Sequence, residues 1–134
     1  MDCSSDYIKM CEKAAEIQEL RKEKDGDFFS RGLAGVEVWS ESYTAEYGDK
    51  IENADVWLPR QDQLQEMLLI EPINSEWICN PTDSELAMLF VDFIDNEIDR
   101  RNQLRLTESM EQLWLSFTMA EKFNKYWDGE SWVT

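Results

Sequence analysis

The N-terminal segment of the chain has the period of an amphipathic helix. Between Tyr7 and Ile17, apolar residues recur at intervals of three or four, and charged residues fill the positions between them. Ser4 or Ser5 is placed to accept a hydrogen bond from a free amide of the first turn. This pattern predicts an N-terminal helix that ends near residues 24–26.

Short extended runs follow this helix. Residues 28–29, 36–40 and 56–58 are rich in the β-branched and aromatic side chains that strands favour, and glycines separate them. Pro59 then favours the start of a helix, because its missing N–H costs nothing in a first turn. We expect short antiparallel strands here and a helix after them. The buried face of that helix would consist of Leu64, Met67 and Leu68.

A further helix is expected from about residue 84 to Arg101. Thr82 and Glu85 have the spacing of a capping box, in which the hydroxyl and the carboxylate each bond the other residue's backbone amide. The alternative is a strand from Met88 to Phe93, because short apolar runs are ambiguous. In the helix, the inward side chains would be Leu86, Leu89, Phe90, Phe93 and Ile94, and the outward ones Glu85, Asp92, Asp95 and Asp99.

The last part of the chain predicts another helix. Thr107 or Ser109 would cap it, and apolar residues continue on one broad face from Met110 to Trp127. A face of this width indicates packing on two sides. We expect Asp128-Gly129 to stop the helix and the final residues to fold back.

Length and composition favour one domain. The chain has 134 residues, 43% of them hydrophobic, and its six Trp, six Phe and four Tyr supply enough bulky material for a core. We predict that residues 1–134 form a small single domain of the α+β class. It would have an N-terminal helix, short antiparallel strands in the middle and two C-terminal helices.

The chain lacks the patterns of secreted and membrane proteins. Its start has no basic and apolar signal segment, and its longest apolar stretch, residues 86–91, is shorter than the roughly 20 residues of a membrane-spanning helix. Cys3, Cys11 and Cys79 are odd in number and form no C-x-x-C pair, which disfavours a disulfide framework or a zinc site. We expect a soluble, cytoplasmic protein with no membrane partner, and Cys11 buried in the core.

The usual residues of catalysis are missing. Histidine is absent, and the five glycines never have the spacing of a phosphate-binding loop. Asp92 and Asp95 would share a helical face, but such carboxylate pairs arise by chance among 29 acidic residues. We therefore predict no catalytic residue, no cofactor and no metal site. An enzyme that uses carboxylates and a divalent metal is the alternative.

Charge is the most extreme property of the chain. Its 13 basic and 29 acidic residues give a net charge of −16. Residues 26–99 hold 17 acidic and three basic residues, a net charge of −14. This segment should repel nucleic acid and attract basic protein surfaces. The alternative is a solvated acidic surface that maintains solubility.

Two groups of residues are candidates for contact with a partner. The first is the outward acidic row of the third predicted helix. The second is the amide-rich segment Arg60, Gln61, Asp62 and Gln63, which could form a recognition surface or could cap a short helix that packs through its apolar side. The acidic candidates are Glu85, Asp92, Asp95 and Asp99.

Three passages resemble uncharacterised proteins of phages and prophages of Gram-positive, Clostridium-like bacteria. They are Tyr7-Ile8-Lys9-Met10-Cys11-Glu12-Lys13-Ala14, the Trp-Leu-Pro-Arg-Gln-Asp-Gln-Leu-Gln motif at 57–65, and the C-terminal pair at 110–115 and 127–133. The pair reads Met-Glu-Gln-Leu-Trp-Leu and Trp-Asp-Gly-Glu-Ser-Trp-Val. The resemblance implies a phage accessory protein of the host cytoplasm and supplies no catalytic residue or cofactor.

Phage ancestry adds two functional hypotheses. Small acidic phage proteins include inhibitors that occupy the DNA-binding grooves of host or defence proteins, so a DNA mimic is one possibility by analogy. The other is a structural or assembly protein that forms a homo-oligomer through its Trp-rich helices. We favour a non-enzymatic module that binds a basic protein surface.

Overall fold

The computed structural model describes residues 1–22, 24–32, 35–40, 55–70, 82–101 and 109–134, except for the side chains of residues 70 and 97–101. It confirms the α+β class and the order of its parts. The elements are α1 (Ser5–Lys13), α2 (Ala15–Glu19), β1 (Phe28–Ser30), β2 (Val36–Val38), β3 (Val56–Leu58), α4 (Gln61–Ile70), α5 (Asp83–Arg101), α6 (Met110–Phe123), β4 (Tyr126–Trp127) and β5 (Trp132–Val133).

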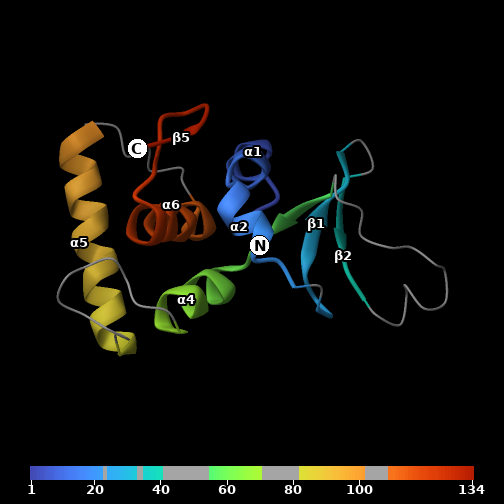
Figure 1. Cartoon of the computed structure of the whole chain (residues 1–134), viewed down its shortest axis with the longest axis horizontal. Helices are drawn as coiled ribbons and strands as arrows, with labels where there is room; N and C mark the ends of the chain where they lie inside the picture. The colour runs from blue at the N-terminus through green and yellow to red at the C-terminus, as the bar shows by residue number, and fades with distance from the viewer. Residues whose placement is uncertain (23, 33–34, 41–54, 71–81, 102–108) are drawn as a thin grey trace.

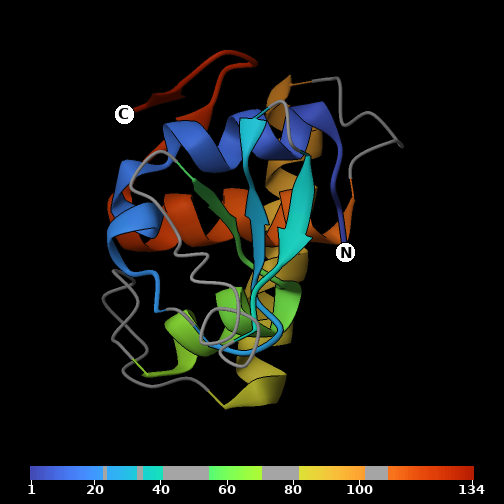
Figure 2. The same cartoon turned by 90° about the vertical axis from the view of Figure 1, so that its right-hand side faces the viewer.

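The elements are arranged along the long axis of the molecule (Figure 1). The sheet of β1, β2 and β3 forms one end, and α5 forms the other. Between them, α6 packs against α4, α5 and α1, while α1 packs against β3. Figure 2 shows the sheet in front of α6, with α5 behind it. The apolar face of α6 is therefore covered on more than one side, as its width predicts.

The three central strands form an antiparallel sheet in the order β2-β1-β3. Phe29 lies opposite Trp57 across β1 and β3, and both side chains are buried. The Tyr7 hydroxyl, on α1, donates a 2.6 Å hydrogen bond to the carbonyl of Pro59, the first residue after β3. This bond ties the N-terminal helix to the point where the chain leaves the sheet. The expected strands are confirmed, although β2 ends at Val38 rather than continuing to residue 40.

The N-terminal helix is capped as expected but is shorter and broken. Ser4 Oγ accepts a hydrogen bond from the Tyr7 amide, which confirms one of the two proposed caps. Ala14 leaves helical geometry, with ψ at 70°, and separates α1 from α2. The Cys11 carbonyl at the break accepts from the Ala14 amide and from Gln18 Nε2. The expectation of one helix to residues 24–26 was therefore wrong, because side-chain bonding competes with the helical ladder at this point.

The helix at α5 confirms the capping box. The Thr82 amide donates to Glu85 Oε2 at 2.8 Å, and the Glu85 amide donates to Thr82 Oγ1 at 3.3 Å. These reciprocal bonds satisfy two amides that the first turn leaves without helical partners. The strand alternative for residues 88–93 was wrong, since this stretch lies inside α5.

The last helix is capped by Ser109, whose Oγ accepts from the Gln112 amide. Residue 107, the other proposed cap, lies outside the described residues. The expected end at residues 128–129 was wrong. Asn124 adopts the left-handed conformation, with φ at 53°, and ends α6 at Phe123. Asparagine tolerates this geometry better than most residues, so it acts as the C-terminal stop. Trp127 consequently lies in the β4–β5 hairpin, which confirms that the end of the chain folds back.

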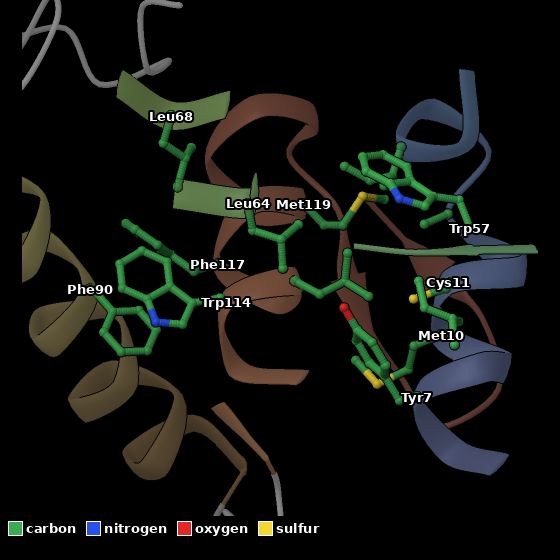
Figure 3. Close-up of a cluster of buried hydrophobic side chains, with 14 of the residues drawn as sticks. Tyr7, Met10, Cys11, Trp57, Leu64, Leu68, Phe90, Trp114, Phe117 and Met119 are labelled. Atoms are coloured by element: carbon green, nitrogen blue, oxygen red, sulfur yellow. The ribbon is translucent and has the colours of Figure 1, made fainter. Parts of the chain in front are cut away.

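The core runs through the middle of the molecule. Figure 3 shows two side-chain groups around α6: an aromatic group against α5, and a mixed group that includes Tyr7, Cys11 and Trp57. In the first, the rings of Phe90 and Trp114 are stacked, with centroids 4.0 Å apart and planes 8° from parallel. Cys11 is fully buried, as expected. The stacked pair anchors α5 to the rest of the domain.

Candidate functional site

The outward side of α5 is the candidate site. Its inner side chains include the buried Leu86 and Phe90. Glu85, Asp92 and Asp95 point away from the core and are exposed, as expected. The side chain of the fourth acidic candidate, at position 99, lies outside the described residues.

Two apolar side chains share this outward side. Met88 is 69% exposed and Val91 is 54% exposed, although both are large hydrophobic residues. At 100° per residue, positions 88, 91 and 95 fall on one narrow stripe, and positions 85 and 92 fall on the adjacent row. We call this surface the α5 outer face; it consists of Glu85, Met88, Val91, Asp92 and Asp95.

The α5 outer face has one sign of charge. Residues 83–96 include four acidic and no basic residues, which are Asp83, Glu85, Asp92 and Asp95. All four side chains are exposed. Glu85, Asp92 and Asp95 lie on the outer face, so its negative potential extends over about 15 Å of helix, at 1.5 Å per residue. An apolar stripe inside a charged border is the usual anatomy of a surface that contacts another protein.

The second candidate, residues 60–63, makes contacts within the domain. Arg60 Nη1 donates to the Gly26 carbonyl at 2.9 Å and lies 3.4 Å from Asp27 Oδ1. Gln63 Nε2 donates to the same Asp27 oxygen at 2.7 Å, and Gln63 Oε1 accepts from the Arg60 amide. Arg60 and Gln63 thus hold the start of β1 against α4. Asp62 is exposed and ion-paired with Arg60.

These contacts explain how the carboxylate of Asp27 is accommodated in the interior. It is 1% exposed, and the Lys24 amide also donates to its Oδ2 at 3.1 Å. A buried carboxylate requires such partners, because its desolvation is otherwise costly. The amide-rich segment therefore has a structural role in capping and anchoring α4. Gln61 is half-buried in the first turn of the same helix.

Neither a metal site nor a bilayer-spanning segment is found in the described part of the chain. No three Cys, Asp or Glu side chains of these residues are grouped so that they could hold a metal ion. Among the same residues, no helix is both long enough and apolar enough to cross a bilayer. Cys79, the third cysteine, lies outside the described residues.

Sequence reasoning identified the acidic part of the α5 outer face but not its apolar part. Met88 and Val91 lie in an apolar run that reads as core, and the structure shows that they face outward. The signal available in the sequence was their position on the helical side opposite Leu86 and Phe90. Comparisons with protein-family models, with curated proteins and with solved structures found no match.

Proposed function

We propose that the chain is a non-enzymatic phage accessory protein that binds a basic, amphipathic helix of another protein through the α5 outer face. The observation that carries this proposal is the exposure of Met88 and Val91 inside a row of acidic side chains. The phage origin is supported by the resemblance of the three sequence passages. In this proposal the protein acts in the host cytoplasm, in keeping with its odd number of cysteines.

The chemistry of the surface selects the partner. A partner helix can bury its own apolar stripe on Met88 and Val91, and its Lys or Arg side chains then reach the flanking carboxylates. A net charge of −16 accelerates the encounter with such a basic segment. The apolar contact supplies affinity, and the acidic border supplies orientation and specificity.

A second copy of the chain is a poorer occupant of this surface. Pairing two α5 outer faces would bring Glu85, Asp92 and Asp95 close to the same acids of the other copy. Like charges in contact are destabilising, and no base lies within residues 83–96 to offset them. The homo-oligomer through Trp-rich helices has no support here either, since Trp114, the tryptophan of α6, is buried.

The test is a site-directed crosslink from the host lysate. A photoreactive amino acid at position 88 should crosslink to a basic partner, whereas the same amino acid at Val38 should not. Val38 is a matched control because it is 57% exposed and lies at the other end of the molecule. The yield of the crosslink should fall at about 1 M salt, where charge screening acts within about 3 Å and slows and misaligns the encounter.

Charge-reversal variants provide a second test of the proposal. The double variant Asp92→Lys, Asp95→Lys should abolish capture, and Glu12→Lys, Glu19→Lys should leave it unchanged. Both pairs are exposed and change the net charge equally. Equal loss of capture in the two variants would show that only the overall charge matters. Equal retention of capture would show that α5 does not contact the partner. A captured nuclease, repressor or polymerase would identify the sharper form of the proposal, an inhibitor that occupies a basic nucleic-acid groove.

A further inference from the structure

A pocket of about 230 Å³ lies between β3, α4, α6 and the segment that follows α2. No residue of α5 lines it, so it is separate from the α5 outer face. Its apolar wall consists of side chains from three parts of the chain, and its polar wall is dominated by lysine. The lining residues are Leu20, Lys22, Lys24, Trp57, Gln63, Glu66, Met67 and Lys122.

The lining of the pocket is positively charged, whereas the protein as a whole is negatively charged. Three of its eight lining residues are Lys and one is Glu, whereas the whole chain has 13 basic and 29 acidic residues. Lys22 and Lys24 are exposed and form no ion pair with a described residue. Lys122 Nζ donates to the Met67 carbonyl at 3.3 Å, which places this ammonium beside α4. Three lysines in the lining of one cavity favour an anion within it.

Trp57 forms a buried part of the pocket wall. It lines the pocket, yet only 3% of its surface is exposed. A large and nearly buried indole offers a rigid apolar surface to an aromatic ring. Figure 3 shows this indole beside Met119, and Lys122 lies three positions further along α6 on the same side.

The volume and the lining residues of the pocket suit a small planar ligand. An apolar cavity of about 150 Å³ accommodates a benzene molecule. The remaining volume of this pocket is enough for one carboxylate or phosphate group. Leu20, Trp57 and Met67 supply apolar and aromatic contact for a ring, and the lysines supply the counter-charge.

We propose that this pocket binds a single-ring aromatic anion, with the ring against Trp57 and Met67 and the anionic group beside Lys22, Lys24 and Lys122. This binding is independent of the proposed protein partner and of α5. The proposal covers phosphate and carboxylate head groups, which share the same recognition by ammonium groups.

Titration with phenyl phosphate and with benzoate, followed by NMR of the indole N–H resonances, tests the proposal. The resonance that disappears in Trp57→Phe identifies Trp57, and it should shift as the ligand binds because the ring of the ligand lies against the indole. Trp114 provides an internal control. Its indole is also buried, but Trp114 does not line the pocket, so its resonance should stay in place.

Charge variants and neutral ligands complete the test. The double variant Lys22→Gln, Lys24→Gln should weaken binding at least tenfold, whereas Lys13→Gln, which removes an exposed lysine of α1, should change it less than twofold. Benzyl alcohol, which has a ring and no charge, should bind at least tenfold more weakly than either anion. Tighter binding of phenyl phosphate than of benzoate would assign a phosphoryl head group, and the reverse a carboxylate. The proposal is wrong if the Trp57 resonance does not move below about 10 mM ligand, or if the neutral ligand binds equally well.

Discussion

The side-chain amide of Gln18 forms two hydrogen bonds with the backbone of Trp57. Gln18 Nε2 donates to the Trp57 carbonyl at 2.9 Å, and the Trp57 amide donates to Gln18 Oε1 at 2.9 Å. In the sheet order β2-β1-β3, β3 is an edge strand, and these two backbone groups face away from β1. The glutamine therefore replaces a neighbouring strand, which protects an edge that could otherwise pair with another chain.

Removal of this amide should destabilise the domain. We expect Gln18→Ala to lower the free energy of unfolding by about 2 kcal/mol, because two backbone groups of the buried Trp57 lose their partners. Urea unfolding followed by circular dichroism measures the change. Glu19→Ala is the control, since Glu19 is exposed in the same helix, and it should change stability by less than about 0.5 kcal/mol. Equal effects of the two variants would contradict a specific role of the amide.

The N-terminus contributes a pH-dependent contact. Asp2 Oδ2 accepts from Ser109 Oγ at 2.5 Å and from Gln112 Nε2 at 2.8 Å, and Asp2 Oδ1 accepts from the Ser4 amide. Partial burial acts to raise the pKa of Asp2, but these hydrogen bonds together outweigh it and lower the pKa below 3.8. A depressed carboxyl pKa stabilises the fold above the unfolded value, and this stability is lost as pH falls through the folded value.

Asp2→Asn should therefore be less stable than the natural chain at about pH 6, and the difference should narrow toward about pH 2.5. Thermal unfolding of both proteins over this range measures the difference in Tm. Asp6→Asn is the control, because Asp6 is exposed and forms none of the hydrogen bonds between the N-terminus and α6. A difference between Asp2→Asn and the natural chain that stays constant with pH would show that the Asp2 charge is not involved.

The order of the fold could be predicted from the sequence because its signals are local. The capping box of Thr82 and Glu85 and the cap at Ser109 each depend on residues within one turn of a helix. Periodicity also located the buried faces of α4 and α5. The ends of the N-terminal helix and of α6 were not predicted, because Gln18 and Asn124 act there through contacts and conformations that periodicity does not encode.

The candidate sites were predictable to different extents. The acids of the α5 outer face follow from helical periodicity, so their exposure could be expected. The lysine-lined pocket could not be anticipated, since Lys22 and Lys122 are 100 positions apart and reach the same pocket only in the folded chain. Residues 60–63 look like a recognition segment, yet the buried Asp27 that binds Arg60 and Gln63 lies more than 30 positions earlier.

Phe90 makes two of the aromatic contacts that attach α5 to α6. The Phe90 ring stacks on Trp114 and lies 5.6 Å from the ring of Phe117. Phe90→Ala should lower stability by about 3 kcal/mol, the lower end of the cost of removing a buried aromatic ring. Met88→Ala should cost less than about 0.5 kcal/mol, because Met88 faces solvent. Hydrogen exchange should show faster exchange of α5 amides in Phe90→Ala; uniform protection in both variants would contradict this anchoring.

The two described cysteines should differ in reactivity. Cys3 is exposed and Cys11 is buried, and burial is the main cause that raises the pKa of the Cys11 thiol. A hydrogen bond with Tyr7 acts to lower this pKa but does not offset the burial. Only the thiolate reacts readily with an alkylating reagent, so Cys11 combines poor access with a small reactive fraction.

Iodoacetamide at about pH 8 should label Cys3 within minutes and leave Cys11 unlabelled until the protein is unfolded in urea. Mass spectrometry can separate the two sites, because cleavage after Lys9 places Cys3 and Cys11 in different tryptic peptides. Cys11→Ser should remain unlabelled at position 11 in both conditions and serves as the assignment control. Equal labelling of Cys3 and Cys11 in the native protein would mean that α1 separates from β3 on the timescale of the reaction. The hydrogen bond from Tyr7 to the Pro59 carbonyl, which ties α1 to the end of that strand, would then have to open on the same timescale.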